Sequence, residues 1–157
     1  HRVGVFVNPT RAEVERAVAE IGLDVVQLHG DETPEFCREL PRRTLKAVRV
    51  GPGFEAAEAL RFENAAGGIL LDTRTDGKGA VPGGTGRAFD WTLARDVRRS
   101  ARYLVLAGGL TPDNVARAVA AVEPDAVDVS SGVECAPGRK DPARVAAFVR
   151  AVRAATR

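Results

Sequence analysis

The chain has 157 residues, of which 45% are apolar and 28% charged, and this composition is typical of a folded globular protein. The net charge is only +2, and basic residues cluster no further than pairs such as Arg42-Arg43, which argues against a nucleic-acid partner. No apolar run is long enough to span a membrane, and no signal peptide is evident. We therefore expect one cytoplasmic domain over residues 1–157.

Two cysteines, Cys37 and Cys135, lie far apart in the sequence, as do the two histidines, His1 and His29. Two cysteines in such unrelated settings make neither a disulfide framework nor a metal-binding quartet. Cys37 lies in an apolar helix stripe and is expected in the core, whereas Cys135 is expected on a surface loop. We predict no metal site.

Six short apolar runs recur along the chain at a nearly constant spacing. Their continuous apolar character, rather than strict alternation, predicts strands that are buried on both faces of a parallel sheet. The spacing favours a (β/α)₈ barrel over an open dinucleotide-binding sheet, because no G-x-G-x-x-G follows the first run. The predicted strands are 3–7, 25–29, 46–50, 68–72, 103–107 and 126–130.

Helical stripes lie between these runs and after the last one, and each stripe is expected to pack an apolar face against the sheet. One stripe covers 14–21, another 115–122 and a third 145–152. Helix starts with an N-cap followed by proline are predicted at Thr33-Pro34, Thr111-Pro112 and Asp141-Pro142.

The first candidate for chemistry is Asp72, which follows the apolar run Ile69-Leu70-Leu71. In a barrel the active site gathers at the C-terminal ends of the strands, which is where this residue falls. Partial removal from water favours the protonated form of a carboxyl group and suits it to general-acid catalysis. The alternative is a side chain that only caps its own loop.

Small residues end the two final strands, as Gly108-Gly109 and Ser131-Gly132. Backbone N–H groups at adjacent strand ends can cradle an anion, and a serine hydroxyl adds a donor. Barrels often hold a phosphate group at this place. The alternative is that these glycines only satisfy tight turns.

Three further strand-end residues are weaker candidates. His29 could donate to a ligand or merely hold its turn, and Arg49 ends the third run. Asp128 lies inside the last predicted strand, where a buried acceptor that organises the loop is favoured over chemistry. The Gly-rich stretch 83–87 lacks the spacing of a phosphate loop and is expected to form a mobile flap over the site.

Seven stretches, in order from Val3 to about Val149, resemble the phosphoribosylanthranilate isomerase family of tryptophan biosynthesis. Each is modest alone, but their order makes the set specific. They are VGVFVN, VVQLHGDE, KAVRV, ILLDT, GGTGRAFDW, LAGGLTPDNV and DVSSGVE followed by PG and KD.

The resemblance implies a (β/α)₈ barrel and a cofactor-free Amadori rearrangement, the reaction of an aldose–ketose intramolecular oxidoreductase. It makes Asp72 the general acid that opens the furanose ring. It places the substrate phosphate on Gly108, Gly109, Ser131 and Gly132, and the anthranilate beside His29. Asp128 and Arg49 are further possible site residues. The partner would be a phosphorylated small molecule, bound by a monomer or homodimer.

The chain departs from the family pattern at its beginning. The family's general base is a cysteine in an N-terminal Lys-Ile-Cys-Gly strand, and an arginine on the second βα loop holds the anthranilate carboxylate. Neither stretch occurs in residues 1–157. We therefore expect the six predicted strands to be strands three to eight, in a piece of a longer chain. The sheet should then have an unpaired strand at each end.

Two alternatives remain open on the sequence. One is a non-catalytic relative that binds a sugar phosphate or completes its barrel with a partner chain. The other is a different phosphate-binding barrel from a neighbouring step of tryptophan or histidine biosynthesis, although GGTGRAFDW and DVSSGVE argue against it. Cys135 could replace the missing base, but a loop thiol without an activating partner is the simpler interpretation.

Overall fold

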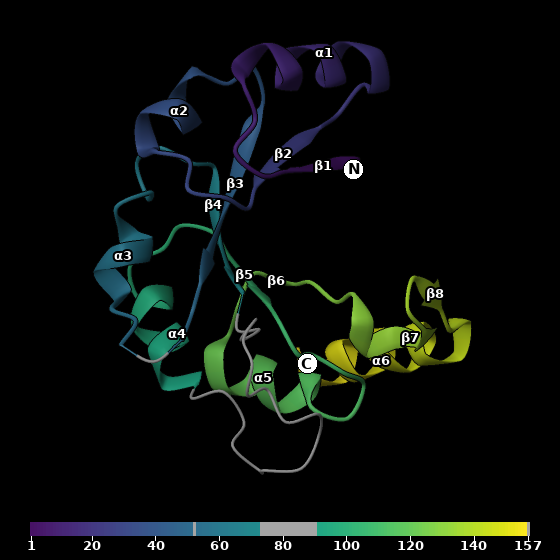
Figure 1. Cartoon of the computed structure of the whole chain (residues 1–157). Helices are drawn as coiled ribbons and strands as arrows, with labels where there is room; N and C mark the ends of the chain where they lie inside the picture. The colour runs from purple at the N-terminus through teal and green to yellow at the C-terminus, as the bar shows by residue number, and fades with distance from the viewer. Residues whose placement is uncertain (52, 73–90, 157) are drawn as a thin grey trace.

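Six parallel strands form one curled sheet in the part of the chain that the structure describes, with the strands side by side in chain order (Figure 1). The structure is a computed structural model and describes residues 1–51, 53–72 and 91–156. All six predicted strands are present, although the third begins earlier than expected and the sixth ends earlier. They are β1 (Val3–Phe6), β2 (Val25–Leu28), β3 (Arg43–Arg49), β4 (Gly68–Asp72), β5 (Leu104–Ala107) and β6 (Ala126–Val127).

Helices connect successive strands and lie around the convex face of the sheet (Figure 1). A short 3₁₀ helix, η1 (Ser131–Val133), and a small hairpin, β7 (Glu134–Ala136) with β8 (Arg139–Lys140), follow β6; the sequence did not predict this hairpin. The α-helices are α1 (Arg11–Ile21), α2 (Pro34–Glu39), α3 (Ala56–Leu60), α4 (Trp91–Arg98), α5 (Val115–Val122) and α6 (Pro142–Ala155).

The apolar core has two layers, because alternate residues of each strand face opposite sides of the sheet. On the convex side, residues such as Val26, Leu28, Ile69 and Leu71 pack against the helices in two large clusters. On the concave side a smaller cluster joins neighbouring strands; its buried members are Ala47, Leu70, Val105 and Ala107. The curl of the sheet therefore encloses a second, smaller core.

Local capping agrees with the sequence at two of the three predicted helix starts. Thr33 and Asp141 accept hydrogen bonds from the first-turn N–H groups of α2 and α6. The predicted cap at Thr111 is wrong, because α5 begins only at Val115, after a turn over 112–114. The Asn114 side chain closes that turn by accepting a hydrogen bond from the N–H of Thr111.

The first and last strands form the ends of the sheet, as the sequence predicted. The prediction that every strand is buried on both faces is wrong for β1. Val3 and Val5, on the concave face of this edge strand, are 47% and 61% exposed, as is Val7 just beyond it at 66%. Only one strand flanks β1, so the concave core does not extend over these side chains.

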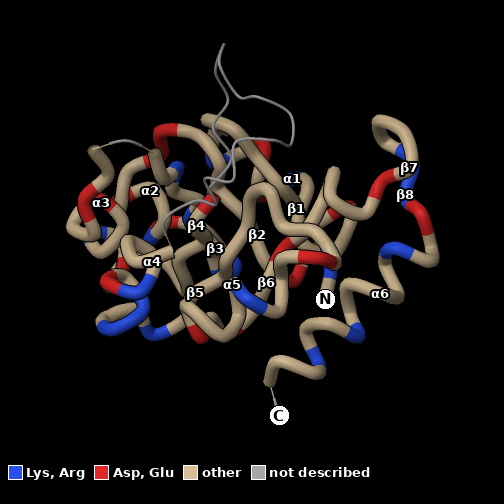
Figure 2. Tube along the Cα trace, turned by 90° about the horizontal axis from the view of Figure 1, so that it is seen from below, with Lys and Arg blue, Asp and Glu red and all other residues tan. Residues whose placement is uncertain are grey.

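The third apolar stripe is also less buried than predicted. In α6 only Phe148 is fully buried, while Val145 and Val149 are about 40% exposed. This helix packs mainly against its neighbour α5 rather than on the sheet. Both charge signs are distributed over the outer helices and loops (Figure 2). Within the described ranges, no helix combines the length and apolar character that a membrane crossing requires.

The contrast between β1 and β2 gives a direct stability test. Val26 is fully buried, and replacing it with alanine should lower the free energy of unfolding by about 2–3 kcal/mol through lost burial and a residual cavity. Val5→Ala, on the exposed face of β1, should change it by no more than about 0.5 kcal/mol. Urea unfolding measures both values. Equal losses would mean that the concave face of β1 is covered in solution.

Candidate active site

The concave face carries polar side chains at the C-terminal end of the sheet. Because side chains alternate along a strand, His29, Arg49, Asp72 and Asp128 all fall on the same face as the concave core. The strands are parallel, so these four residues come to one rim. The predicted gathering of strand-end residues is therefore present, within a single curved surface.

His29 and Asp72 are in direct contact across the intervening strand β3. The Nε2 atom of His29 lies 3.2 Å from Oδ2 of Asp72, and the Asp72 side chain is 8% exposed. Leu28 on β2 pairs with Lys46 on β3, so the next residues, His29 and Ala47, lie at the same level. Its methyl side chain leaves room for the imidazole to cross to β4, so a small residue on β3 permits this contact.

A second hydrogen bond fixes the other side of the imidazole ring. Nε2 of Gln27 lies 3.2 Å from Nδ1 of His29, and Gln27 is itself 8% exposed. Gln27 and His29 are two residues apart on β2 and therefore share the concave face. The result is a row of three polar groups, Gln27, His29 and Asp72, held on a largely apolar surface.

A buried ion pair lies beneath the loop that carries His29. Lys46 Nζ is 3.0 Å from Oε2 of Glu32, and each side chain is 3% exposed. Lys46 also donates to the carbonyl oxygens of Leu28, Gly30 and Ala47. One ammonium group therefore satisfies several acceptors where the main chain leaves β2, which reduces the cost of burying the charge.

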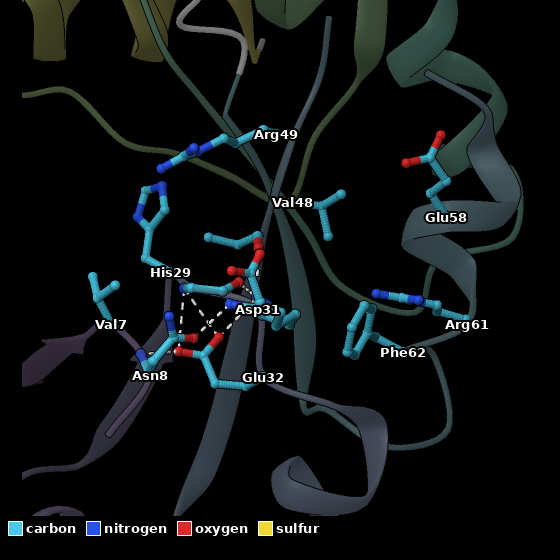
Figure 3. A pocket seen from close by; sticks show the side chains of 13 residues that line it. Val7, Asn8, His29, Asp31, Glu32, Val48, Arg49, Glu58, Arg61 and Phe62 are labelled. Atoms are coloured by element: carbon cyan, nitrogen blue, oxygen red, sulfur yellow. Dashed lines mark hydrogen bonds and ion pairs between the residues drawn. The ribbon is translucent and has the colours of Figure 1, made fainter. Parts of the chain in front are cut away.

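Glu32 extends this network to the end of β1. Its carboxylate accepts hydrogen bonds from the backbone N–H groups of Asn8 and Gly30, and the Asn8 side chain accepts one from the N–H of Asp31 (Figure 3). Asn8 adopts the left-handed region at φ 48°, which asparagine tolerates better than most residues. The loops after β1 and β2 are thus joined by side-chain-to-backbone bonds.

A cavity of about 300 Å³ opens beside this network. Its walls come from the ends of β1, β2 and β3 and from the segment 58–62, and they include His29, Asp31 and Arg49 (Figure 3). Arg49 is exposed, and its side chain extends toward the side of the cavity where His29 lies. Arg49 is also the register partner of Asp72 on β4. The cavity therefore presents a cation close to the His29–Asp72 pair.

The loops after β5 and β6 meet at the other end of the rim. Gly108 and Gly109 follow β5 with φ of 81° and 61°, a backbone conformation that favours glycine. A Cβ atom on Gly132 would lie only 1.8 Å from the carbonyl oxygen of Leu110, so the η1 backbone rests directly on the β5 loop. The loops that carry Gly108-Gly109 and Ser131-Gly132 are thus in contact.

Lys140 stabilises the β6 loop from the hairpin. Its Nζ donates to the carbonyl and hydroxyl oxygens of Ser130 and to Glu134 Oε1, the last at 2.7 Å. The hydrogen bond from Lys140 to Glu134, together with one from the N–H of Gly138, lowers the pKa of Glu134 below its ordinary value. Lys140, paired with Glu134, therefore holds Ser130 at the start of the loop that carries Ser131 and Gly132.

Residues 1–151 match the family model described as N-(5'phosphoribosyl)anthranilate (PRA) isomerase. The chain belongs to this family. The chain is 50% identical over 153 residues to the N-(5'-phosphoribosyl)anthranilate isomerase of Pseudomonas putida strain KT2440, with 98% of this chain and 72% of that protein aligned. It is 53% identical to that of Pseudomonas aeruginosa strain LESB58, over 99% and 71% of the two chains.

Solved structures of phosphoribosylanthranilate isomerases share the fold. The crystal structure from Thermotoga maritima superposes with a TM-score of 0.87 at 42% identity, covering 98% of this chain and 73% of that one. Another isomerase structure, in complex with reduced 1-(o-carboxyphenylamino)-1-deoxyribulose 5-phosphate, gives 0.82 at 39% identity, over 98% and 71% of the chains. The curled parallel sheet is therefore the fold of this family, over most of the length of its members.

Three residues singled out in the sequence, Asp128, Cys37 and Cys135, differ in their burial. The expectation that Asp128 is buried inside the last strand is wrong, because β6 ends at Val127 and the Asp128 side chain is exposed. Cys37 is buried as predicted, and burial raises the pKa of its thiol. Cys135 is exposed and donates to the carbonyl oxygen of Arg139. The stretch 83–87 lies outside the described residues.

Sequence reasoning missed the groups that hold the site in place. Lys46 and Glu32 were not singled out, because a lysine inside an apolar run reads as a strand residue with an exposed end. Gln27 lies two residues before His29, and strand alternation alone would have placed both on one face. Lys140, within the KD stretch, gave no signal of its contact with Ser130, because that contact depends on an unpredicted hairpin.

Removing one partner of the buried ion pair should be strongly destabilising. Lys46→Met leaves the Glu32 carboxylate buried without its cation, so we expect a loss of about 3–5 kcal/mol in the free energy of unfolding, measured with urea. Lys140→Met, at a partly exposed pair, should cost no more than about 1 kcal/mol. The double variant Lys46→Met/Glu32→Leu should recover part of the loss. Additive losses would contradict direct coupling of Lys46 with Glu32.

The same pair predicts a specific acid dependence. Burial acts to raise the pKa of Glu32, but hydrogen bonds from Lys46 and from backbone N–H groups outweigh it, so the pKa lies below its ordinary value. The pKa of Glu32 in the folded protein is therefore below its value of about 4.3 in the unfolded chain. The stabilisation is fully present above about pH 4.3 and is lost as the pH falls through the pKa of the folded state. Urea unfolding from pH 7 to 3 should show a smaller acid loss in Glu32→Gln than in the wild type. Parallel curves would contradict this.

Proposed function

We propose that this chain catalyses the isomerisation of N-(5-phosphoribosyl)anthranilate to 1-(2-carboxyphenylamino)-1-deoxyribulose 5-phosphate, a step of tryptophan biosynthesis. The observation that carries the proposal is a buried carboxyl group, Asp72, at the C-terminal end of a strand, hydrogen-bonded to His29 on the rim of a family-typical sheet. The reaction is an aldose–ketose isomerisation, an intramolecular oxidoreduction in which the C2′ hydroxyl carbon is oxidised and C1′ is reduced. It needs no cofactor.

In the first step Asp72 acts as general acid. It gives a proton to the furanose ring oxygen, the C1′–O bond breaks, and the nitrogen lone pair of the anthranilate forms the C1′=N bond of a protonated Schiff base. Positioned proton transfer of this kind contributes on the order of 10²–10⁴ in rate. His29, in contact with the Asp72 carboxylate and lining the cavity, would lie on the anthranilate side.

In the second step a base removes the C2′ proton, and the electron pair of the C–H bond forms the enolamine, which then tautomerises to the ketone. The resemblance assigns this base to a cysteine of a Lys-Ile-Cys-Gly strand, a stretch outside residues 1–157. Within this chain the thiol of Cys135, in the hairpin after β6, is the second candidate. Arg49, on the rim of the cavity, is suited to the anthranilate carboxylate as an exposed guanidinium group.

The phosphate is proposed to bind between the loops after β5 and β6, on the backbone of Gly108, Gly109, Ser131 and Gly132. The contact of Gly132 with the Leu110 carbonyl supports this, because it holds both loops against each other. Lys140 holds the second of these loops through its hydrogen bonds to Ser130. Asp128, on the same rim, would face the sugar hydroxyls between the two ends of the substrate.

We propose further that the six strands correspond to strands three to eight of a (β/α)₈ barrel, in a single domain. The alignment of this chain to 72% or 73% of its relatives' lengths, and the exposed concave face of β1, support this assignment. The cytoplasmic location and the choice between monomer and homodimer stay predictions. One solved relative is described as a dimeric isomerase converted to monomers. The alternative of a non-catalytic relative is not favoured by the family match.

Replacing the acid is the direct test of the proposal. Asp72→Asn should lower turnover by on the order of 10²–10⁴-fold, because the amide cannot protonate the ring oxygen. Substrate would be generated in situ and the loss of its anthranilate fluorescence followed. Asp96→Asn, on the exposed side of α4, is the matched control and should stay within about twofold.

The outcomes separate the alternatives. Turnover that survives in Asp72→Asn would contradict the role of Asp72. Wild-type turnover that is lost in Cys135→Ser, with Asp72 intact, would place the base in the hairpin. A wild type that binds the reduced product analogue by calorimetry but does not turn over would support the non-catalytic alternative.

A further inference from the structure

Gln27 occupies a place in the site to which the proposed reaction assigns no role. Its side chain is almost completely buried on the concave face, where an apolar residue would otherwise complete the small core. A buried amide is costly unless its hydrogen bonds are made, so its presence calls for a specific partner. That partner is the His29 ring, at 3.2 Å from Gln27 Nε2 to Nδ1.

The direction of this hydrogen bond determines where the ring proton lies. In this orientation of the amide its NH₂ group faces the ring and can only donate, so Nδ1 of His29 accepts and carries no proton. In the neutral ring the proton is then on Nε2. Nε2 faces Oδ2 of Asp72 at 3.2 Å, so the same tautomer donates to the carboxyl group. The two contacts are consistent with each other and form one chain of donors from Gln27 to Asp72.

The reverse arrangement conflicts with the proposed chemistry. If Gln27 presented its carbonyl oxygen to an Nδ1–H group, Nε2 would carry a lone pair toward Asp72. Asp72 Oδ2 would then have to donate its own proton to His29, and that proton would point away from the substrate. With the Nε2–H tautomer, Oδ2 accepts, the acidic proton resides on Oδ1, and the carboxylate left after proton transfer keeps a donor.

We infer that Gln27 is a positioning residue that holds His29 in the Nε2–H tautomer and thereby directs the acidic proton of Asp72 toward the substrate. The effect on the Asp72 proton rests on the proposed function, whereas the tautomer assigned to His29 does not. In the part of the chain that the structure describes, the charged residues that line the cavity with His29 are Arg49, Asp31, Glu58, Arg61 and the Glu32–Lys46 pair. Glu32 and Lys46 neutralise each other. None of these groups makes a hydrogen bond to His29 among the described residues.

The tautomer can be measured without turnover. The chain has only two histidines, so ¹⁵N-histidine labelling with long-range proton–nitrogen correlation, assigned with a His29→Asn variant, reads each ring nitrogen separately. In the wild type at neutral pH, Nδ1 of His29 should be of the unprotonated type and Nε2 of the protonated type. A protonated Nδ1 with an unprotonated Nε2 would overturn the inference. Because this readout needs no substrate, it stands even if the chain proves inactive.

Two variants of similar shape separate positioning from packing. Gln27→Met keeps the length but has no donor, so His29 should shift to a mixture of tautomers. Gln27→Glu can only accept when ionised, so it should place a proton on Nδ1. In both, kcat should fall on the order of tenfold to a hundredfold with KM little changed.

Folding is checked by urea unfolding of each variant. A Gln27→Met protein that is folded and retains the wild-type nitrogen signals would overturn the role of Gln27, whatever its activity. Changed signals with unchanged kcat would overturn the link to Asp72 and leave the proposed function intact. Loss of turnover in the wild type itself, with the expected signals present, would count against the proposed function alone.

Discussion

The Lys46–Glu32 ion pair is the interaction on which the geometry of the rim depends. An ammonium group buried at 3% exposure is tolerated only because a carboxylate and several carbonyl oxygens surround it. Those acceptors belong to the end of β2, to its loop and to β3, and the carboxylate in turn holds the N–H of Asn8 after β1. A single buried charge therefore sets the relative positions of three strand ends. Hydrophobic packing alone would not specify the loop conformation that presents His29.

Above this ion pair, the small residues of the concave face decide which polar groups can meet. Ala47 allows the His29 ring to pass across β3, and Gln27 and Asp72 hold the ring on its two sides. The curl of the sheet is part of the same arrangement, because residues on β2 and β4 approach each other only on a concave surface. At the far end of the rim, Gly132 allows the two glycine-containing loops to touch. The groups proposed for the aromatic acid and those proposed for the phosphate of the substrate therefore belong to different ends of this rim.

Much of this could be predicted from the sequence, because the relevant signals are local. The strands follow from the apolar runs, the helix starts at Pro34 and Pro142 from capping, and the strand-end position of Asp72 and the glycine pairs from the βα order. What could not be predicted depends on contacts distant in sequence. Lys46 is inside KAVRV, and only the loop from β2 makes its burial favourable. The burial assigned to Asp128 was wrong because β6 is two residues long and lies at the end of the sheet, so no later strand covers it.

The strand order has a consequence for the stability of different parts of the fold. In the six-stranded sheet each strand after β1 pairs with the one that precedes it in the chain, so each βα unit closes a loop of modest length and structure can spread from unit to unit, as in repeat proteins. Local opening should then begin at β1 and β6, which have a neighbour on one side only, and reach the middle last. Asp72 ends β4 and Lys46 lies in β3, both in the middle of the sheet. The proposed general acid and the buried lysine therefore lie where amide hydrogens should exchange most slowly.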